Sequence, residues 1–152
     1  MSAPRKYCTT TVDTNTVNTT VGGLTSATTI RPSIYDIVIG SEATPADQAA
    51  RFIFQRYTVA GTSTAVTPQA LDPADPASLL AVTTGQNHSA EPTYTANAIM
   101  LPIALNQRAT YRWVAAPGGE IVMPATAANG IGCQAVVVTS AYAVTVGWHH
   151  AE

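Results

Sequence analysis

The segment SIYDIVIGSEATPADQAARFIFQRYTVAGTSTAVTPQALDPADP, residues 33–76, decides the fold class. Residues 33–40 and 50–57 both alternate with a period of two, the spacing of side chains on a β-strand. Residues 41–47 between them carry Glu, Thr, Pro and Asp, which are typical of a turn. The segment therefore predicts two paired strands that are joined by a surface loop. One side of the two strands is formed by Tyr35, Ile37, Ile39, Phe52 and Phe54.

A polar tract follows the second strand. Residues 58–78 are too rich in Gly, Pro, Thr and Asp to form a core of their own. Isolated apolar residues, Val59, Val66 and Leu71, interrupt the tract. These side chains predict a long loop that is ordered by a few buried contacts.

Short strand-like runs continue to the end of the sequence, and no long helical stripe occurs. Pro102 within one run predicts an edge strand or a bulge. The last two runs are separated by Ser140 and Ala141 alone, which predicts a closing hairpin. This spacing of strands and turns predicts an all-β sandwich or barrel. The runs are residues 79–83, 94–105, 108–115, 120–124, 131–139 and 142–148.

The alternation also predicts which side chains form the core of the sandwich. The expected core residues are Tyr35, Ile37, Phe52, Phe54, Val136, Val138, Val144 and Val146.

Residues 1–29 differ from the rest of the chain, because they are rich in Thr and Asn and their apolar residues are widely spaced. We expect an extended N-terminal arm here, followed by a sandwich domain over residues 30–152. Such an arm gains order on a partner chain, or else folds back as an edge strand of its own sandwich. The expected partner-binding residues are Arg5, Lys6, Tyr7, Val12 and Val17, although Arg5 and Lys6 are also compatible with solvated tail charges.

The composition limits the function. A chain of 152 residues is large enough for one domain with one core. Only 11% of its residues are charged and its net charge is −2, so binding to nucleic acid through phosphate neutralisation is disfavoured. No apolar run approaches the roughly 20 residues of a membrane span, and the first ten residues lack the apolar region of a secretory signal.

The two cysteines, Cys8 and Cys133, lie far apart and have no neighbours at metal-ligand spacing. We expect both to be free thiols in a protein made in a reducing cytoplasm.

Few residues are candidates for chemistry. The adjacent His149 and His150 would point to opposite faces of a strand and could not share a metal within one chain. Asp72 and Asp75 suit turn capping better than calcium binding. The sequence has no nucleophile, zinc or phosphate-binding motif, so we expect no enzyme activity, no cofactor, no metal and no small-molecule substrate.

Four phrases of the sequence carry a family resemblance: residues 41–78, 86–94, 105–120 and 130–152. Together they resemble the small capsid-associated decoration, or cement, proteins of tailed bacteriophages. The resemblance spans roughly residues 30–152. It implies a jelly-roll β-sandwich that binds the major capsid protein on the outer surface of an icosahedral shell, as a homotrimer.

We therefore expect a structural virion protein that stabilises the capsid from outside. The alternative is a carbohydrate-binding or host-adhesion module of a virion, because β-sandwiches commonly bind glycans through exposed aromatic residues. The alternating Tyr111 and Trp113 suit the core better than a sugar site. A small β-sandwich enzyme would need titratable residues that converge in a pocket.

Overall fold

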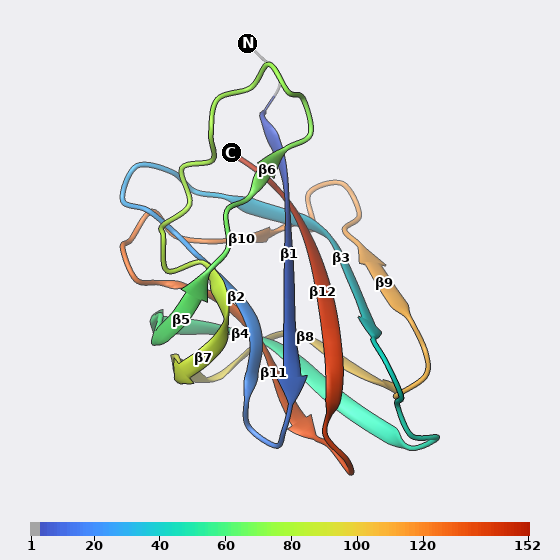
Figure 1. Ribbon diagram of the computed structural model, residues 1–152. Helices are drawn as coiled ribbons and strands as arrows, with labels where there is room; N and C mark the ends of the chain where they lie inside the picture. The colour runs from blue at the N-terminus through green and yellow to red at the C-terminus, as the bar shows by residue number, and fades with distance from the viewer. Residues whose placement is uncertain (1–3) are drawn as a thin grey trace.

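The computed structural model describes residues 4–152, which form two antiparallel β-sheets and no helix (Figure 1). The strands are β1 (Lys6–Asn15), β2 (Thr20–Thr25), β3 (Ser33–Ser41), β4 (Ala49–Val59), β5 (Thr62–Ala65), β6 (Gln69–Ala70), β7 (Gly85–Ala90), β8 (Thr93–Asn106), β9 (Tyr111–Val114), β10 (Ile121–Val122), β11 (Gly130–Val137) and β12 (Tyr142–Ala151). The first sheet has the order β10-β3-β12-β1-β6, with β9 also paired to β3. The second sheet has the order β5-β7-β2-β11-β4-β8. The predicted all-β sandwich is confirmed.

Strands that follow one another in the sequence mostly lie in opposite sheets. The chain crosses between the sheets from β1 to β2, from β3 to β4 and from β11 to β12. The predicted pairing of residues 33–40 with 50–57 and the predicted closing hairpin are therefore wrong. Ser140 and Ala141 are not among the residue types, Gly, Asn and Asp, that readily adopt the positive φ angles of a two-residue hairpin turn. This link therefore suits a crossing between the two sheets instead.

The N-terminal segment belongs to both sheets. β1 pairs along its whole length with β12, from Lys6↔Ala151 to Asn15↔Tyr142, and β2 pairs with β11. The expectation of an extended arm is therefore wrong over these strands, and the segment is part of its own domain. Threonine explains the difference, because this β-branched residue suits strands and its side chain fills buried positions. Residues 1–3 lie outside the described part of the chain.

The core confirms five of the eight expected positions. Ile37, Phe52, Phe54, Val144 and Val146 are all buried.

Tyr35, Val136 and Val138 are only half-buried. Val138 lies beyond the end of β11, and β-bulges explain the other two positions. Opposite β12, the register jumps from Asp36 to Ile34, so Tyr35 is the extra residue of β3. Val136 is likewise the extra residue of β11 opposite β4. A bulge shifts the alternation by one residue, which moves the buried face to the neighbouring side chains.

Trp148 lies at the centre of the core and is fully buried. Its indole Nε1 donates a hydrogen bond to Thr11 Oγ1 of the neighbouring strand at 3.1 Å. Its ring packs edge-on against Phe54 of the opposite sheet, with 5.1 Å between the ring centroids. Trp148 therefore joins the two sheets.

β8 forms one edge of the second sheet, as Pro102 predicts.

The ring of Tyr57 lies against β11, where a Cβ atom at Gly130 would come within 2.4 Å of Tyr57 Cζ. Glycine at position 130 thus lets a tyrosine ring lie close to the sheet.

Candidate binding surface

A long loop, residues 66–84, is held on the end of the sandwich where β1 begins and β12 ends (Figure 1). We call it the apical loop. Its short strand β6 pairs with the beginning of β1. The backbone N–H of Leu71 donates to the carbonyl of Lys6 at 2.8 Å, and Tyr7 Oη donates to the carbonyl of Pro76 at 3.1 Å. The loop is thus ordered by contacts with the first strand.

Glu152 holds the second half of the apical loop. Its carboxylate accepts hydrogen bonds from the backbone N–H of Leu79, at 2.9 Å, and from the hydroxyl of Ser78. His150 Nε2 lies 3.2 Å from Glu152 Oε1. Burial alone would raise the pKa of this carboxyl, but the hydrogen bonds from His150, Ser78 and Leu79 together lower it below its ordinary value. The charged carboxylate is therefore the form that fixes the loop.

Three apolar side chains of the apical loop face solvent. Leu71 is 52% exposed, Leu79 49% and Val82 86%. The expectation of a strand over residues 79–83 is wrong, because this segment is part of the loop. An anchored loop that exposes apolar side chains is a candidate contact for a protein partner.

Charged side chains surround a hollow beside the loop. The hollow has a volume of about 440 Å³ and is lined by Pro4, Arg5, Lys6, Leu71, Asp72 and Asp75. Arg5 Nε lies 3.8 Å from Asp75 Oδ1. Asp72 Oδ1 accepts a hydrogen bond from the N–H of Ala74, which confirms its predicted capping role. The apical surface, defined as Arg5, Lys6 and the apical loop, therefore combines exposed charges with exposed apolar groups.

The five expected partner-binding residues lie in different places. Arg5 and Lys6 are exposed and belong to the apical surface. Tyr7 is fully buried, with its ring stacked on His150, so its assignment to a partner contact is wrong. Val12 is half-buried within β1. Val17 is 53% exposed in the turn between β1 and β2, far from the apical loop (Figure 1).

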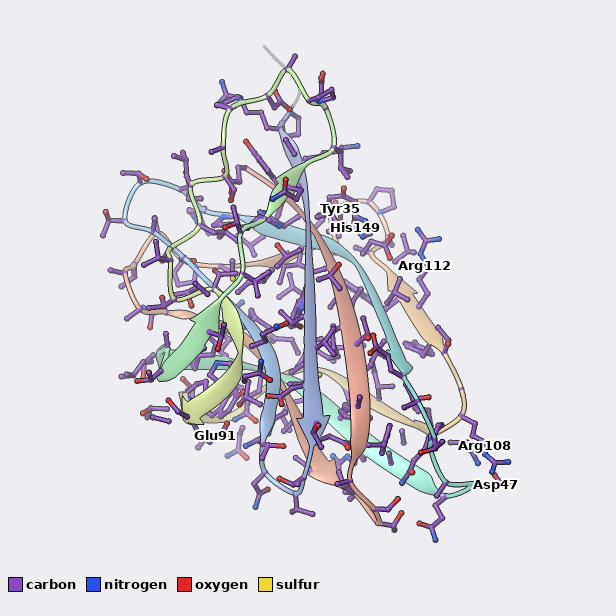
Figure 2. All side chains as sticks on the ribbon, in the orientation of Figure 1. Tyr35, Asp47, Glu91, Arg108, Arg112 and His149 are labelled. Atoms are coloured by element: carbon purple, nitrogen blue, oxygen red, sulfur yellow. The ribbon has the colours of Figure 1, made fainter. Side chains whose placement is uncertain are left out.

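A cluster of polar side chains lies on the outer face of the first sheet, where Figure 2 shows Tyr35, His149 and Arg112 near one another. Arg112 Nε donates to Asp36 Oδ1 at 3.0 Å, and Arg112 Nη2 pairs with Asp36 Oδ2. His149 Nδ1 lies 3.7 Å from Asp36 Oδ2. Asp36 is almost fully buried, so Arg112 compensates a buried charge.

The two histidines point to opposite faces, as expected. His149 is partly exposed beside Asp36, whereas His150 is fully buried near Glu152. Within residues 4–152, no group of three or more His, Cys, Asp or Glu side chains is placed to hold a metal ion.

Replacing Arg112 by Gln is expected to change how stability depends on pH. Hydrogen bonds from Arg112 lower the pKa of Asp36 below its ordinary value, against the opposing effect of burial. Because the pKa of Asp36 is lower in the folded protein than its value near 4 in the unfolded chain, the ionised carboxylate stabilises the folded protein above about pH 4. This contribution is lost as the pH falls through the folded-state pKa. In R112Q the carboxylate loses its partner, so its pKa is expected to rise. The urea midpoint of R112Q should therefore lie below that of the wild type at pH 7, with the difference shrinking toward pH 3. An equal difference at both values would contradict this account.

Both cysteines are free thiols in the structure, in agreement with the prediction. Cys8 is half-buried in β1, and Cys133 is fully buried in β11 of the other sheet. Burial raises the pKa of the Cys133 thiol, which keeps it protonated and unreactive.

Several residues of these clusters were not expected from the sequence. Asp36 carries a signal in retrospect, because it is a lone carboxylate among the apolar residues of β3. Glu152 carries none, since the loop residues that it binds, Ser78 and Leu79, are more than 70 residues away in the sequence. Tyr111 is 41% exposed, so its expected place in the core is wrong, whereas Trp113 packs partly against the core.

The described chain, residues 4–152, contains no helix that is long and apolar enough to cross a membrane. No family model, no curated protein and no solved structure matches the chain.

Proposed function

We propose that this protein is a structural virion protein, a capsid decoration or cement protein that binds the outer surface of the major capsid protein shell and stabilises it. The observation that carries the proposal is the apical loop, which is anchored by backbone hydrogen bonds and still exposes Leu71, Leu79 and Val82. An ordered loop loses little conformational entropy on binding, so its apolar side chains can contribute fully to affinity.

The strand order supports the fold that accompanies this role. The strands β1-β12-β3-β9 of one sheet face β2-β11-β4-β8 of the other. We infer from this order, in which the chain repeatedly crosses between these four strands of one six-stranded sheet and these four of the other, that the sandwich is a jelly roll of two Greek keys. The resemblance of residues 30–152 to phage decoration proteins supports the same assignment.

The surface chemistry suits attachment to a protein shell. With 11% charged residues and a net charge of −2, the chain offers no basic surface for DNA, which favours the outside of the capsid over its interior. Arg5 and Lys6 are the exposed cations of the apical surface. They complement an acidic capsid surface and would steer docking through charge.

A homotrimer is part of the proposal. The edge strand β8 has fourteen residues and no charged side chain, and it exposes Ile99 and Met100. An uncharged edge of this length can contact another copy of the chain without bringing like charges together. Light scattering of the free protein measures this directly, and a strictly monomeric mass at micromolar concentration counts against a trimer that forms before capsid binding.

A triple variant of the apical loop tests the capsid-binding role. Leu71→Ser, Leu79→Ser and Val82→Ser together should weaken binding to capsids of the encoding phage by about tenfold to a hundredfold, because three apolar contacts are lost. Co-sedimentation with capsids that lack the protein measures the affinity.

The matched control is Val17→Ser. Val17 is about as exposed as Leu71 but lies at the other end of the sandwich, so capsid affinity should stay unchanged. Normal binding by the triple variant, with loss of binding by V17S, would show that the capsid contact lies at the opposite end of the sandwich, near Val17. Absence of binding by the wild-type chain itself would overturn the proposed function.

A further inference from the structure

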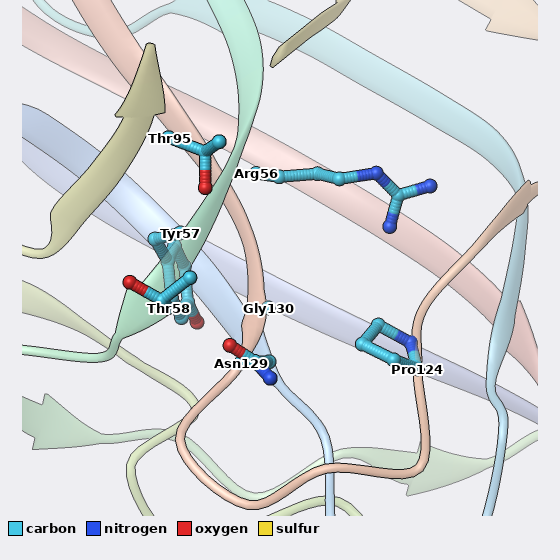
Figure 3. Close-up of a pocket in the computed structure, with 7 residues that line it drawn as sticks. All are labelled: Arg56, Tyr57, Thr58, Thr95, Pro124, Asn129 and Gly130. Carbon is cyan, nitrogen blue, oxygen red and sulfur yellow. The ribbon is translucent and has the colours of Figure 1, made fainter.

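A second hollow lies on the second sheet, where β4 and β8 meet the start of β11. Its volume is about 200 Å³, below the roughly 300–1,000 Å³ of pockets for drug-sized ligands. Figure 3 shows the guanidinium of Arg56 extended over the hollow, with the Pro124 ring and the Asn129 amide below it in the view. The lining residues are Arg56, Tyr57, Thr58, Thr95, Pro124, Asn129 and Gly130.

The hollow carries an unbalanced positive charge. No carboxylate lines it, and Arg56 forms no ion pair with any residue from 4 to 152. A guanidinium offers a planar fork of donors that matches a carboxylate or a phosphate in a bidentate pair. The first chemical requirement on a ligand is therefore an anionic oxygen group such as a carboxylate.

The other polar groups of the hollow suit hydroxyl groups. The hydroxyls of Thr58 and Thr95 and the amide of Asn129 each combine donor with acceptor capacity. A sugar hydroxyl has the same dual character, whereas a peptide carboxylate accepts hydrogen bonds only. Pro124 adds an apolar surface for the ring of the ligand.

The walls of the hollow are rigid. Tyr57 is 2% exposed, and its Oη donates to the carbonyl of Leu24 at 2.8 Å. Gln55 Nε2 donates to the carbonyl of Thr95 at 2.7 Å, which fixes β8 at this point. Ala128, directly before Asn129, has a φ of 65°, a conformation that costs about 1 kcal/mol or more for a non-glycine residue. Backbone strain occurs at binding sites, and here it falls directly before a residue that lines the hollow.

We propose that this hollow binds an acidic sugar unit of a glycan, with the sugar carboxylate on Arg56 and its hydroxyls on Thr58, Thr95 and Asn129. This site lies on the sheet surface, apart from the residues of the apical surface. The inference therefore does not depend on the capsid-binding role. A decoration protein with such a site would present it to glycans outside the virion.

The test uses NMR chemical-shift titration of the full chain with methyl glucuronide, methyl glucoside and acetate as probes. Work at physiological salt screens exposed charges. Methyl glucuronide should bind with a Kd of about 1 mM, which a ligand of this size reaches with ordinary efficiency. The neutral glucoside and acetate should each bind about tenfold more weakly, because the glucoside lacks the carboxylate and acetate lacks the hydroxyl groups.

Arg56→Gln should weaken glucuronide binding about tenfold or more, and Asn129→Ala should weaken it by a smaller factor. The matched control is Arg51→Gln, which removes an exposed arginine of the same strand that does not line the hollow. Equal losses in R56Q and R51Q, equal affinity for glucuronide and acetate, or no shift with glucuronide at 20-fold its expected Kd of about 1 mM would each overturn the proposal. Capsid co-sedimentation of R56Q should match the wild type, so the two proposals fail separately.

Discussion

A chain that lacks residues 1–29 is expected not to fold. The deletion removes β1, which pairs with β12 along its whole length, and β2, which lies between β7 and β11 in the second sheet. β12 loses a partner strand of ten residues, and β11 loses β2. The core loses Tyr7, Val21 and Leu24, all fully buried. Burial of each large apolar side chain contributes about 1.5–3 kcal/mol, and a whole domain is stable by only about 5–15 kcal/mol.

Circular dichroism and a two-dimensional amide NMR spectrum of the truncated chain measure this outcome. We expect poor signal dispersion and no cooperative thermal transition. The matched control removes residues 1–4 only, which precede β1, and should retain a folded spectrum. A truncated chain with a dispersed spectrum and cooperative unfolding would show instead that residues 30–152 form a domain of their own.

The sequence predicted the positions of the strands better than it predicted which of their side chains point to the core. Periodicity identified β3, β4, β8, β11 and β12 with small errors at their ends. It placed Tyr35 and Val136 in the core, whereas bulges at these two residues shift the alternation. A bulge depends on the register with the partner strand, and a single sequence does not show that register.

Strand pairing could not be predicted, because every long strand pairs with strands that are distant in the sequence. β1 pairs with β12 from the other end of the chain. The sequence suggested hairpins between neighbours, which are the commonest local solution. The N-terminal segment was misjudged for a related reason: Thr9 and Thr11 are fully buried, and composition treats threonine as a surface residue.

The sequence predicted part of the apical surface. The tract of Gly, Pro, Thr and Asp predicted a long ordered loop, and Arg5 and Lys6 were expected to meet a partner. The contacts that hold the loop could not be predicted. The bond between Glu152 and Leu79 joins residues 73 positions apart, and it follows only from the crossing of the chain between the sheets.

Replacing Trp148 by Ala is expected to cost about 3–5 kcal/mol of the free energy of unfolding, the range for deleting a large buried aromatic side chain. Trp148 is fully buried and packs edge-on against Phe54 of the other sheet. The cavity would open between the sheets, where neither sheet can move inward without breaking its own ladder. A loss of this size removes a large part of a domain's stability.

The Trp148→Phe variant separates the contribution of the aromatic ring from that of the indole N–H donor. Phenylalanine keeps an aromatic contact with Phe54 but cannot donate to Thr11 Oγ1, which now accepts from the indole at 3.1 Å. The expected cost is about 1–2 kcal/mol, from the lost hydrogen bond and the smaller ring. Urea unfolding should show a lower midpoint at an unchanged slope for both variants. Trp113, half-buried at the edge strand β9, provides the matched control, because W113F should cost less than about 1 kcal/mol. Equal losses for W148F and W113F would show that Trp148 does not join the two sheets, since a residue at an edge would then matter as much as one at the centre.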